Sequence, residues 1–114
     1  MSNKELAKSR FTDVESSLLE LSRWMYHHPE IAFQEFESSA RISGFLAEHG
    51  FIVEHPAYGL DTAFAARSGS SGPEVIICAE YDALPAVGHA CGHNIIATAA
   101  LGAAYALKPI ADEL

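Results

Sequence analysis

The first part of the chain carries the spacing of an amphipathic helix. Between Lys4 and about Tyr26, apolar residues recur at intervals of three and four, which places them on one stripe of a helix. These residues are Phe11, Val14, Leu18, Leu21 and Met25. Pro29 disfavours helical backbone at His28 and cannot itself continue the hydrogen-bond ladder. The pattern therefore predicts a helix that ends at H-H-P-E.

A second helix is predicted from Glu35 to His49. Its inward-facing positions would be Phe36, Ala40, Phe45 and Leu46. Gly50 lies where a glycine commonly caps the C-terminal end of a helix. A strand is expected to follow directly.

Three segments have the composition of strands, namely 51–55, 62–67 and 74–79. The turn-forming stretch S-G-S-S-G-P between the last two predicts a hairpin-like connection. Val75 to Ala79 is apolar at every position, which is typical of a strand covered on both faces in an α/β sheet. The third strand is therefore predicted to be central.

The last predicted helix is unusually apolar. The stretch from Ile95 to Leu107 contains no charged residue, and Pro109 follows it. A helix that is apolar all round is expected to be buried all round. A chain of 114 residues has few elements with which to cover every side of it. We therefore expect the chain to be one domain-sized piece of a larger α/β protein.

Composition and charge narrow the possible partners. The chain is 49% hydrophobic and 19% charged, so it should fold around a core, and its formal net charge is −8. Its lysines and arginines are scattered, which argues against nucleic-acid and anionic-membrane partners. No signal peptide or membrane span is predicted, so a cytoplasmic location with reduced thiols is expected. Cys78, inside an apolar segment, is predicted to be a packed core thiol.

Candidate chemistry gathers in residues 80–94, E-Y-D-A-L-P-A-V-G-H-A-C-G-H-N. Ligands of open α/β sheets bind at the carboxyl ends of strands, which is where this loop is expected. Residues two apart diverge on a helix, so Cys91 and His93 can share a metal only if the helix begins near His93. Cys91 would then lie at the helix N-terminus, where a thiolate is favoured.

The residues alone leave several interpretations of this loop open. Thiolate and imidazole suit zinc or a mixed-ligand metal pair, and His89, Cys91 and His93 could form a local three-ligand site, with Glu80 and Asp82 nearby. Cys91 could instead be a nucleophilic or redox-active thiol activated by a neighbouring histidine. Asp82 could simply hold a turn through its side chain.

Four stretches in this order resemble one known family, the metallopeptidase family M-20 amidohydrolases. They are H-H-P-E-I-A-F-Q-E (27–35), A-E-Y-D-A-L-P (79–85), G-H-A-C-G-H-N (88–94) and the alanine-rich segment that follows. The resemblance covers roughly residues 15–107. It implies that residues 1–114 are the N-terminal part of an α/β, mixed-sheet, zinc-peptidase-like catalytic domain with helices packed on the sheet.

The resemblance also implies a function. Members of the family use two divalent ions, zinc or manganese, to activate water and cleave the amide bond of N-acyl amino acids, p-aminobenzoyl-glutamate-like compounds or small dipeptides. A smaller domain often carries a dimer contact, which implies a homo-oligomer. Cys91 and His93 match the family's metal ligands, and Asp82 matches the acidic residue that orients a ligand or the loop. His89 matches a histidine not usually counted as a ligand.

Two departures from the family pattern matter. Asn94 stands where many relatives have Asp, and the spacer between D-A-L-P and G-H-A-C is short, which resembles the p-aminobenzoyl-glutamate hydrolase and dipeptidase-like branch. The family's remaining ligands and its general-base glutamate have no counterpart in this chain. We therefore expect the isolated chain to be inactive. The alternative is a truncated, non-catalytic module that docks on a partner through exposed apolar surface.

Overall fold

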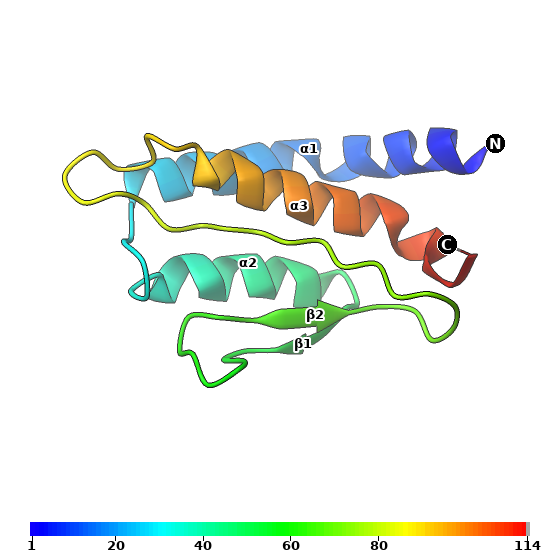
Figure 1. The fold of residues 1–114 in the computed structure, drawn as a ribbon. Coiled ribbons are helices and arrows are strands. Elements are labelled where there is room, and N and C mark those ends of the chain that lie inside the picture. The colour runs from blue at the N-terminus through cyan, green and yellow to red at the C-terminus, as the bar shows by residue number, and fades with distance from the viewer. Residues whose placement is uncertain (114) are drawn as a thin grey trace.

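The computed structural model describes residues 1–113 and shows three helices with a small sheet (Figure 1). The helices are α1 (Asn3–His27), α2 (Phe36–Glu48) and α3 (His93–Leu107), and the 3-10 helix η1 (Lys108–Glu113) continues α3. The strands are β1 (Ile52–Glu54) and β2 (Ala65–Arg67). This mixture of helices and a two-stranded sheet is compatible with the predicted α/β class.

Helix α1 confirms the first prediction closely. Its N-terminus is a capping box in which the Ser2 hydroxyl accepts from the Glu5 N–H at 3.2 Å and the Glu5 carboxylate accepts from the Ser2 N–H at 2.8 Å. The hydrogen bond from the Ser2 backbone N–H, and after it the interaction with the Ser2 hydroxyl, holds the pKa of the Glu5 carboxyl below its usual value. Val14, Leu18 and Met25 form the buried stripe, and the helix stops before Pro29.

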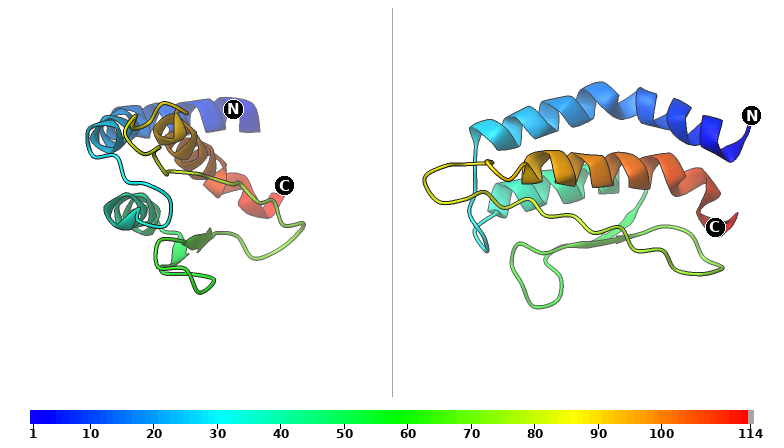
Figure 2. Two further views of the ribbon diagram at one scale, coloured as in Figure 1. Left: turned by 60° about the vertical axis from the view of Figure 1, so that its left-hand side comes forward. Right: turned by 45° about the horizontal axis from the view of Figure 1, so that its top comes forward.

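Helices α1 and α3 lie side by side, and α2 packs beneath them (Figures 1 and 2). The core between the three helices is formed by one cluster of buried residues. Its aliphatic members include Leu18, Met25, Ile42, Leu46 and Leu101. The second predicted helix is thus confirmed in position, but Phe36 and Ala40, which were predicted to face inward, are exposed, and Ile42 lies on the buried face instead.

Gly102 lets α3 approach α1 closely. A Cβ at this position would lie 2.7 Å from the Phe11 ring and 3.1 Å from the Leu18 side chain. Gly44 in α2 is the opposite case, because nothing lies within 4 Å of the Cβ that alanine would add.

We expect Gly102→Ala to lower the free energy of unfolding by about 1 kcal/mol, since the strain of overpacking exceeds the helix-propensity gain of alanine. Gly44→Ala is the matched control and should raise stability by up to about 1 kcal/mol. Urea unfolding of the two variants measures the difference. Equal stabilisation by both would show that α1 and α3 are not in close contact at Gly102.

The sheet is smaller than the sequence predicts. β1 and β2 pair antiparallel with Ile52 opposite Arg67 and Glu54 opposite Ala65, and they pack against α2. Both strands fall within the predicted segments 51–55 and 62–67 but keep only three residues each.

The prediction of a central strand at 74–79 is wrong for the part of the chain that the structure describes, residues 1–113. The segment is extended but belongs to no strand, and Val75, Ile76 and Ile77 are 63%, 75% and 41% exposed. Cys78, predicted to be a core thiol, is exposed as well. A run of apolar residues favours a strand that is covered on both faces. A strand forms, however, only where neighbouring strands are present to hydrogen-bond with its backbone. The part of the chain that the structure describes supplies none.

Helix α3 is buried on one face only, which corrects the prediction of all-round burial. Ala97, Leu101 and Ala106 are buried against the other helices, whereas Ile95 is 64% exposed. Together with η1 the helical run His93–Glu113 has 21 residues and a mean hydropathy of 1.2, long and apolar enough to cross a membrane by length and composition alone. No membrane span was predicted from the sequence, because the uncharged stretch ends at Leu107 and charged residues follow it. Core helices of water-soluble proteins have the same length and composition.

Candidate functional site

The loop that precedes α3 folds back on itself and brings the candidate residues together. Leu84 and Gly88 exchange two backbone hydrogen bonds of 2.9 and 3.1 Å, and Gly88 has a positive φ of 67° that glycine tolerates. The chain therefore reverses direction between Asp82 and the G-H-A-C-G-H stretch. Figure 1 shows this reversal as the yellow loop beside the start of α3.

Asp82 and His93 form the central contact of the site. The Nδ1 atom of His93 lies 2.8 Å from Asp82 Oδ1 and 3.0 Å from the Asp82 carbonyl oxygen. Both partners are acceptors, so Nδ1 carries the proton and donates it. The second ring nitrogen, Nε2, is then the free lone-pair donor of His93. Carboxylate–histidine pairs of this kind fix the ring of a metal-binding histidine.

Cys91 lies in the turn before α3, which begins at His93 as the spacing argument required. Gly92 separates the two residues and adopts a left-handed conformation with φ 73°. The Cys91 thiol is free and exposed. The loop thus presents a thiol and an oriented imidazole at the start of one helix.

His89 differs from its neighbours because it is buried. Only 8% of it is exposed, and neither ring nitrogen has a hydrogen-bond partner within residues 1–113. Burial, and after it the proximity of His93, lowers the pKa of the His89 imidazole. In the described part of the chain, no three His, Cys, Asp or Glu side chains are grouped closely enough to hold a metal. The local three-ligand arrangement of residues 89, 91 and 93 is therefore not formed.

The donors that are present fit part of a metal site. An imidazole held by a carboxylate and a free thiol are both suitable ligands for zinc, but structural sites need four ligands and catalytic sites about three and a water. The structure brings Asp82 and His93 into contact, and it leaves Glu80 exposed. Residues 1–113 supply an incomplete donor set.

Glu30 positions this loop and was missed by sequence reasoning. Its carboxylate accepts from the backbone N–H groups of Ser38 at 2.6 Å and Glu37 at 3.1 Å, and it thereby caps α2. Its carbonyl oxygen accepts from the Ala83 N–H at 2.8 Å, directly after Asp82. Glu30 precedes Glu37 and Ser38 by seven and eight residues. A capping box is recognised in a sequence by a spacing of three residues, so that signal could not identify Glu30.

Asn94 also has a role that the sequence did not show. It is 7% exposed, and its side-chain amide donates to the Ser22 carbonyl at 3.3 Å and to the Ser22 hydroxyl at 3.1 Å. This contact ties the start of α3 to α1. An aspartate at this position could not donate to the carbonyl oxygen.

A hollow of roughly 280 Å³ opens beside Asp82, lined among others by Phe33, Glu35, Leu60 and Tyr81. The buried Tyr81 hydroxyl donates to the Thr62 carbonyl at the base of this region. Burial, assisted by the charge of Glu35, raises the pKa of Tyr81 to about 12.

This pKa predicts a pH dependence of stability. A raised pKa means that the folded chain favours the neutral phenol, so stability is unaffected below the unfolded pKa of about 10 and is lost as the pH rises toward 12. Ultraviolet titration should show one tyrosine ionising near pH 12, and Tyr81→Phe should remove that step. Persistence of the step in the variant would assign it to another tyrosine.

The chain is similar to several amide-bond hydrolases. It is 39% identical over 126 residues to the Xaa-Arg dipeptidase of Mus musculus, a match that covers 97% of this chain and 28% of the relative. It is 31% identical to a subunit of the p-aminobenzoyl-glutamate hydrolase of Escherichia coli, covering 91% of this chain and 24% of the relative. It is also 31% identical to the N-acetyl-L-cysteine deacetylase of Bacillus subtilis, covering 89% and 28%. No family model matches.

The chain spans about a quarter of the length of these curated relatives. Each match nevertheless extends over most of the 114 residues, far beyond the G-H-A-C-G-H stretch, so the similarity does not rest on one motif. The resemblance inferred from the sequence is confirmed: the chain belongs to the metallopeptidase family M-20 of amidohydrolases.

Proposed function

We propose that this chain forms part of a metal-dependent amidohydrolase that cleaves the amide bond of N-acyl amino acids, p-aminobenzoyl-glutamate-like compounds or small dipeptides. The single observation that carries the proposal is the Asp82–His93 hydrogen bond beside the exposed Cys91 thiol. Relatives named as a dipeptidase, a p-aminobenzoyl-glutamate hydrolase and an N-acetyl-L-cysteine deacetylase support the reaction class.

In this proposal Cys91 Sγ and His93 Nε2 hold divalent metal ions, two in the complete enzyme, with zinc or manganese as the metals. A bound metal supplies Lewis-acid polarisation of the amide carbonyl and a lowered pKa of water. Asp82 accepts the Nδ1 proton of His93, which fixes the ring and makes Nε2 the better donor. Glu30 and Asn94 hold the two ends of the loop in place.

We assign residues 1–114 to the N-terminal part of the catalytic domain, a mixed sheet with helices packed on it. The remaining metal ligands and the general base then come from other parts of the polypeptide. A homo-oligomer in the cytoplasm, acting on small amide substrates, completes the proposal. The acidic composition and the scattered basic residues support a small-molecule substrate in preference to a nucleic-acid or anionic-membrane partner.

The test is a chimera in which this chain replaces the segment that it matches in the Escherichia coli hydrolase. We expect the chimera, supplied with zinc or manganese, to hydrolyse p-aminobenzoyl-glutamate or acyl-amino acids. The isolated chain should be slower by at least about 1,000-fold, because an incomplete ligand set forfeits metal catalysis. Enzymatic rates from the isolated chain, or a folded chimera inactive on every amide, would contradict the proposal.

A non-catalytic docking module is the second candidate. The observation that favours it is the exposed apolar surface of Val75, Ile76 and Ile95. A folded chimera that hydrolyses no amide would favour this candidate, whereas hydrolysis would remove it.

A further inference from the structure

Phe33 combines a costly backbone conformation with an exposed ring. The Gln34 N–H donates to the Ile31 carbonyl at 2.9 Å and closes a turn in which Phe33 has a φ of 65°. Glycine is the usual residue at such a position, because a bulky side chain is strained there. The side chain is 72% exposed, so its burial does not offset the strain within residues 1–113. A conformational outlier of this kind points to a function for the side chain.

The side chain lines the hollow beside Asp82. Phe33 and Leu60 provide exposed apolar groups in this hollow, and Ala63 and Ala79 line it as well. Its volume of about 280 Å³ is close to the lower limit of about 300 Å³ for small-molecule pockets. The Asp82 carboxylate that accepts from His93 belongs to a residue of the same lining. The hollow therefore adjoins the candidate metal site.

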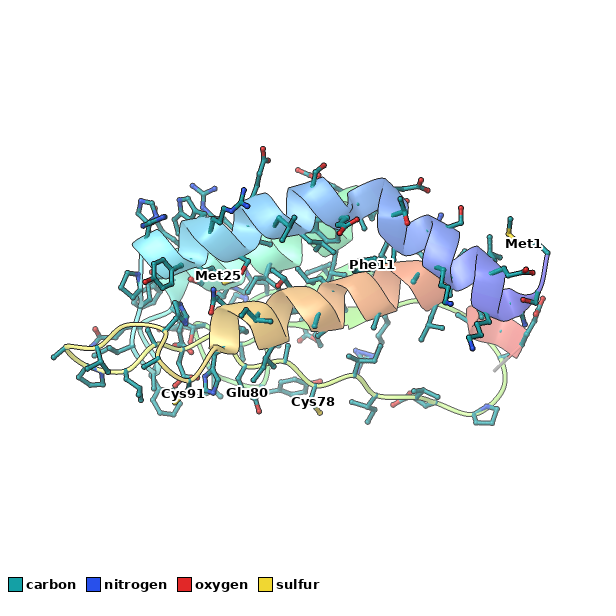
Figure 3. All side chains as sticks on the ribbon, turned by 90° about the horizontal axis from the view of Figure 1, so that it is seen from above. Met1, Phe11, Met25, Cys78, Glu80 and Cys91 are labelled. Carbon is teal, nitrogen blue, oxygen red and sulfur yellow. The ribbon has the colours of Figure 1, made fainter. Side chains whose placement is uncertain are left out.

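The polar part of the lining is acidic. Glu35, Glu80 and Asp82 line the hollow, and within residues 1–113 no lysine or arginine does. The Thr62 hydroxyl donates to Glu35 at 3.1 Å, which leaves the negative charge of Glu35 unpaired by a cation. Seen from above, Glu80 and Cys91 both lie on the side of α3 that faces away from α1 (Figure 3). Because like charges repel, this lining disfavours a carboxylate in the hollow.

The two sides of an N-acyl amino acid differ in charge. The amino-acid side carries a carboxylate on the carbon next to the amide nitrogen, whereas an apolar acyl side carries no charge. Building on the amidohydrolase function proposed above, we propose that Phe33 is a specificity-determining residue. Its ring contacts an apolar acyl group of the substrate in the hollow beside Asp82, and the substrate carboxylate lies outside this hollow.

The hydrolysis of two substrates by the chimera described above tests the proposal. Phe33→Ala should lower kcat/KM for phenylacetylalanine by at least about 10-fold, because the contact between two aromatic rings is lost, and should lower it for acetylalanine by less than about 3-fold. Tyr58→Ala is the matched control and should change neither value. Tyr58 is also an exposed aromatic residue with a positive φ, of 56°, but it does not line the hollow.

Two further measurements need no hydrolysis. Titration calorimetry of the zinc-loaded chimera should show that phenylacetate binds at least about 10-fold more tightly than acetate, and Phe33→Ala should remove most of this preference. The thermal unfolding midpoint of the Phe33→Gly chimera should be equal to that of the unmodified chimera or higher, because glycine adopts a positive φ without strain.

Several results would overturn the proposal. An equal loss for both substrates would show that Phe33 does not select the acyl group, and a larger loss for lysylalanine would assign the hollow to a cationic group. A marked fall of the unfolding midpoint in Phe33→Gly would show that the ring serves the fold. A chimera that hydrolyses amides regardless of Phe33 contradicts this inference alone. One that hydrolyses no amide contradicts the proposed function, and the preference for phenylacetate then decides whether the hollow binds an apolar group.

Discussion

Replacing His93 with alanine in the chimera is expected to abolish hydrolysis, with a loss of at least about 1,000-fold, and to reduce bound metal. The reason is that the Nδ1 atom of His93 is hydrogen-bonded to Asp82 Oδ1 at 2.8 Å. The other ring nitrogen, Nε2, is therefore the atom that we expect to bind the metal. The measurement is the hydrolysis rate together with metal content by elemental analysis.

The Asp82→Asn variant of the chimera tests separately whether Asp82 orients the His93 ring, as distinct from the binding of metal by His93 itself. Asparagine keeps an acceptor for the His93 proton but removes the charge, so we expect a milder loss of about 10–100-fold in activity or metal affinity. Asp61→Asn, at an exposed turn position, is the matched control and should change neither quantity. If His93→Ala kept full metal content and activity, the assignment of His93 as a ligand would be wrong.

Met25→Ala is expected to destabilise the fold most, by about 2–5 kcal/mol, because a large side chain is removed from a site that cannot collapse completely. Met25 is fully buried in the cluster that joins α1 to the other helices. Single domains have only about 5–15 kcal/mol of stability, so a loss of this size takes a large fraction of the total.

Leu19→Ala provides the control for this prediction. Leu19 lies on the same helix but is 49% exposed, so its truncation should cost less than about 0.5 kcal/mol. Urea unfolding followed by circular dichroism gives both values. A similar effect for the two variants would place the core elsewhere than between α1, α2 and α3.

The helices could be predicted because their signals are local. The apolar stripe of α1 and the helix-breaking Pro29 are signals between residues that are close in sequence. The structure agrees, since α1 ends at His27. The beginning of α3 followed from the requirement that Cys91 and His93 not share helical backbone, and the helix does begin at His93.

The strand at 74–79 and the burial of α3 were not predicted correctly, because both depend on neighbours. Val75 to Ala79 has the composition of an interior strand, but hydrogen-bond partners are a property of the whole sheet. The exposed Ile95 has the same cause, since an apolar helix face is buried only if something packs on it.

The site was predicted in part. The sequence identified the loop and the residue pair in it, and the structure brings Asp82 to His93. Their roles toward a metal stay predictions. Glu30 and Asn94 were missed because their partners, Ala83 and Ser22, are distant in sequence, and a lone Glu or Asn carries no spacing signal.

Cobalt substitution of the chimera tests the central claim, that Cys91 and His93 bind metal, most directly. A cobalt ion bound by a thiolate shows a sulfur-to-metal absorption band that oxygen and nitrogen ligands do not produce, and thiolate ligation is the expected state of a metal-bound cysteine. We predict this band in the chimera, its loss in Cys91→Ser, and its retention in Cys78→Ser, the other free cysteine. A cobalt-loaded chimera without the band, or one that keeps it after Cys91→Ser, would contradict the account.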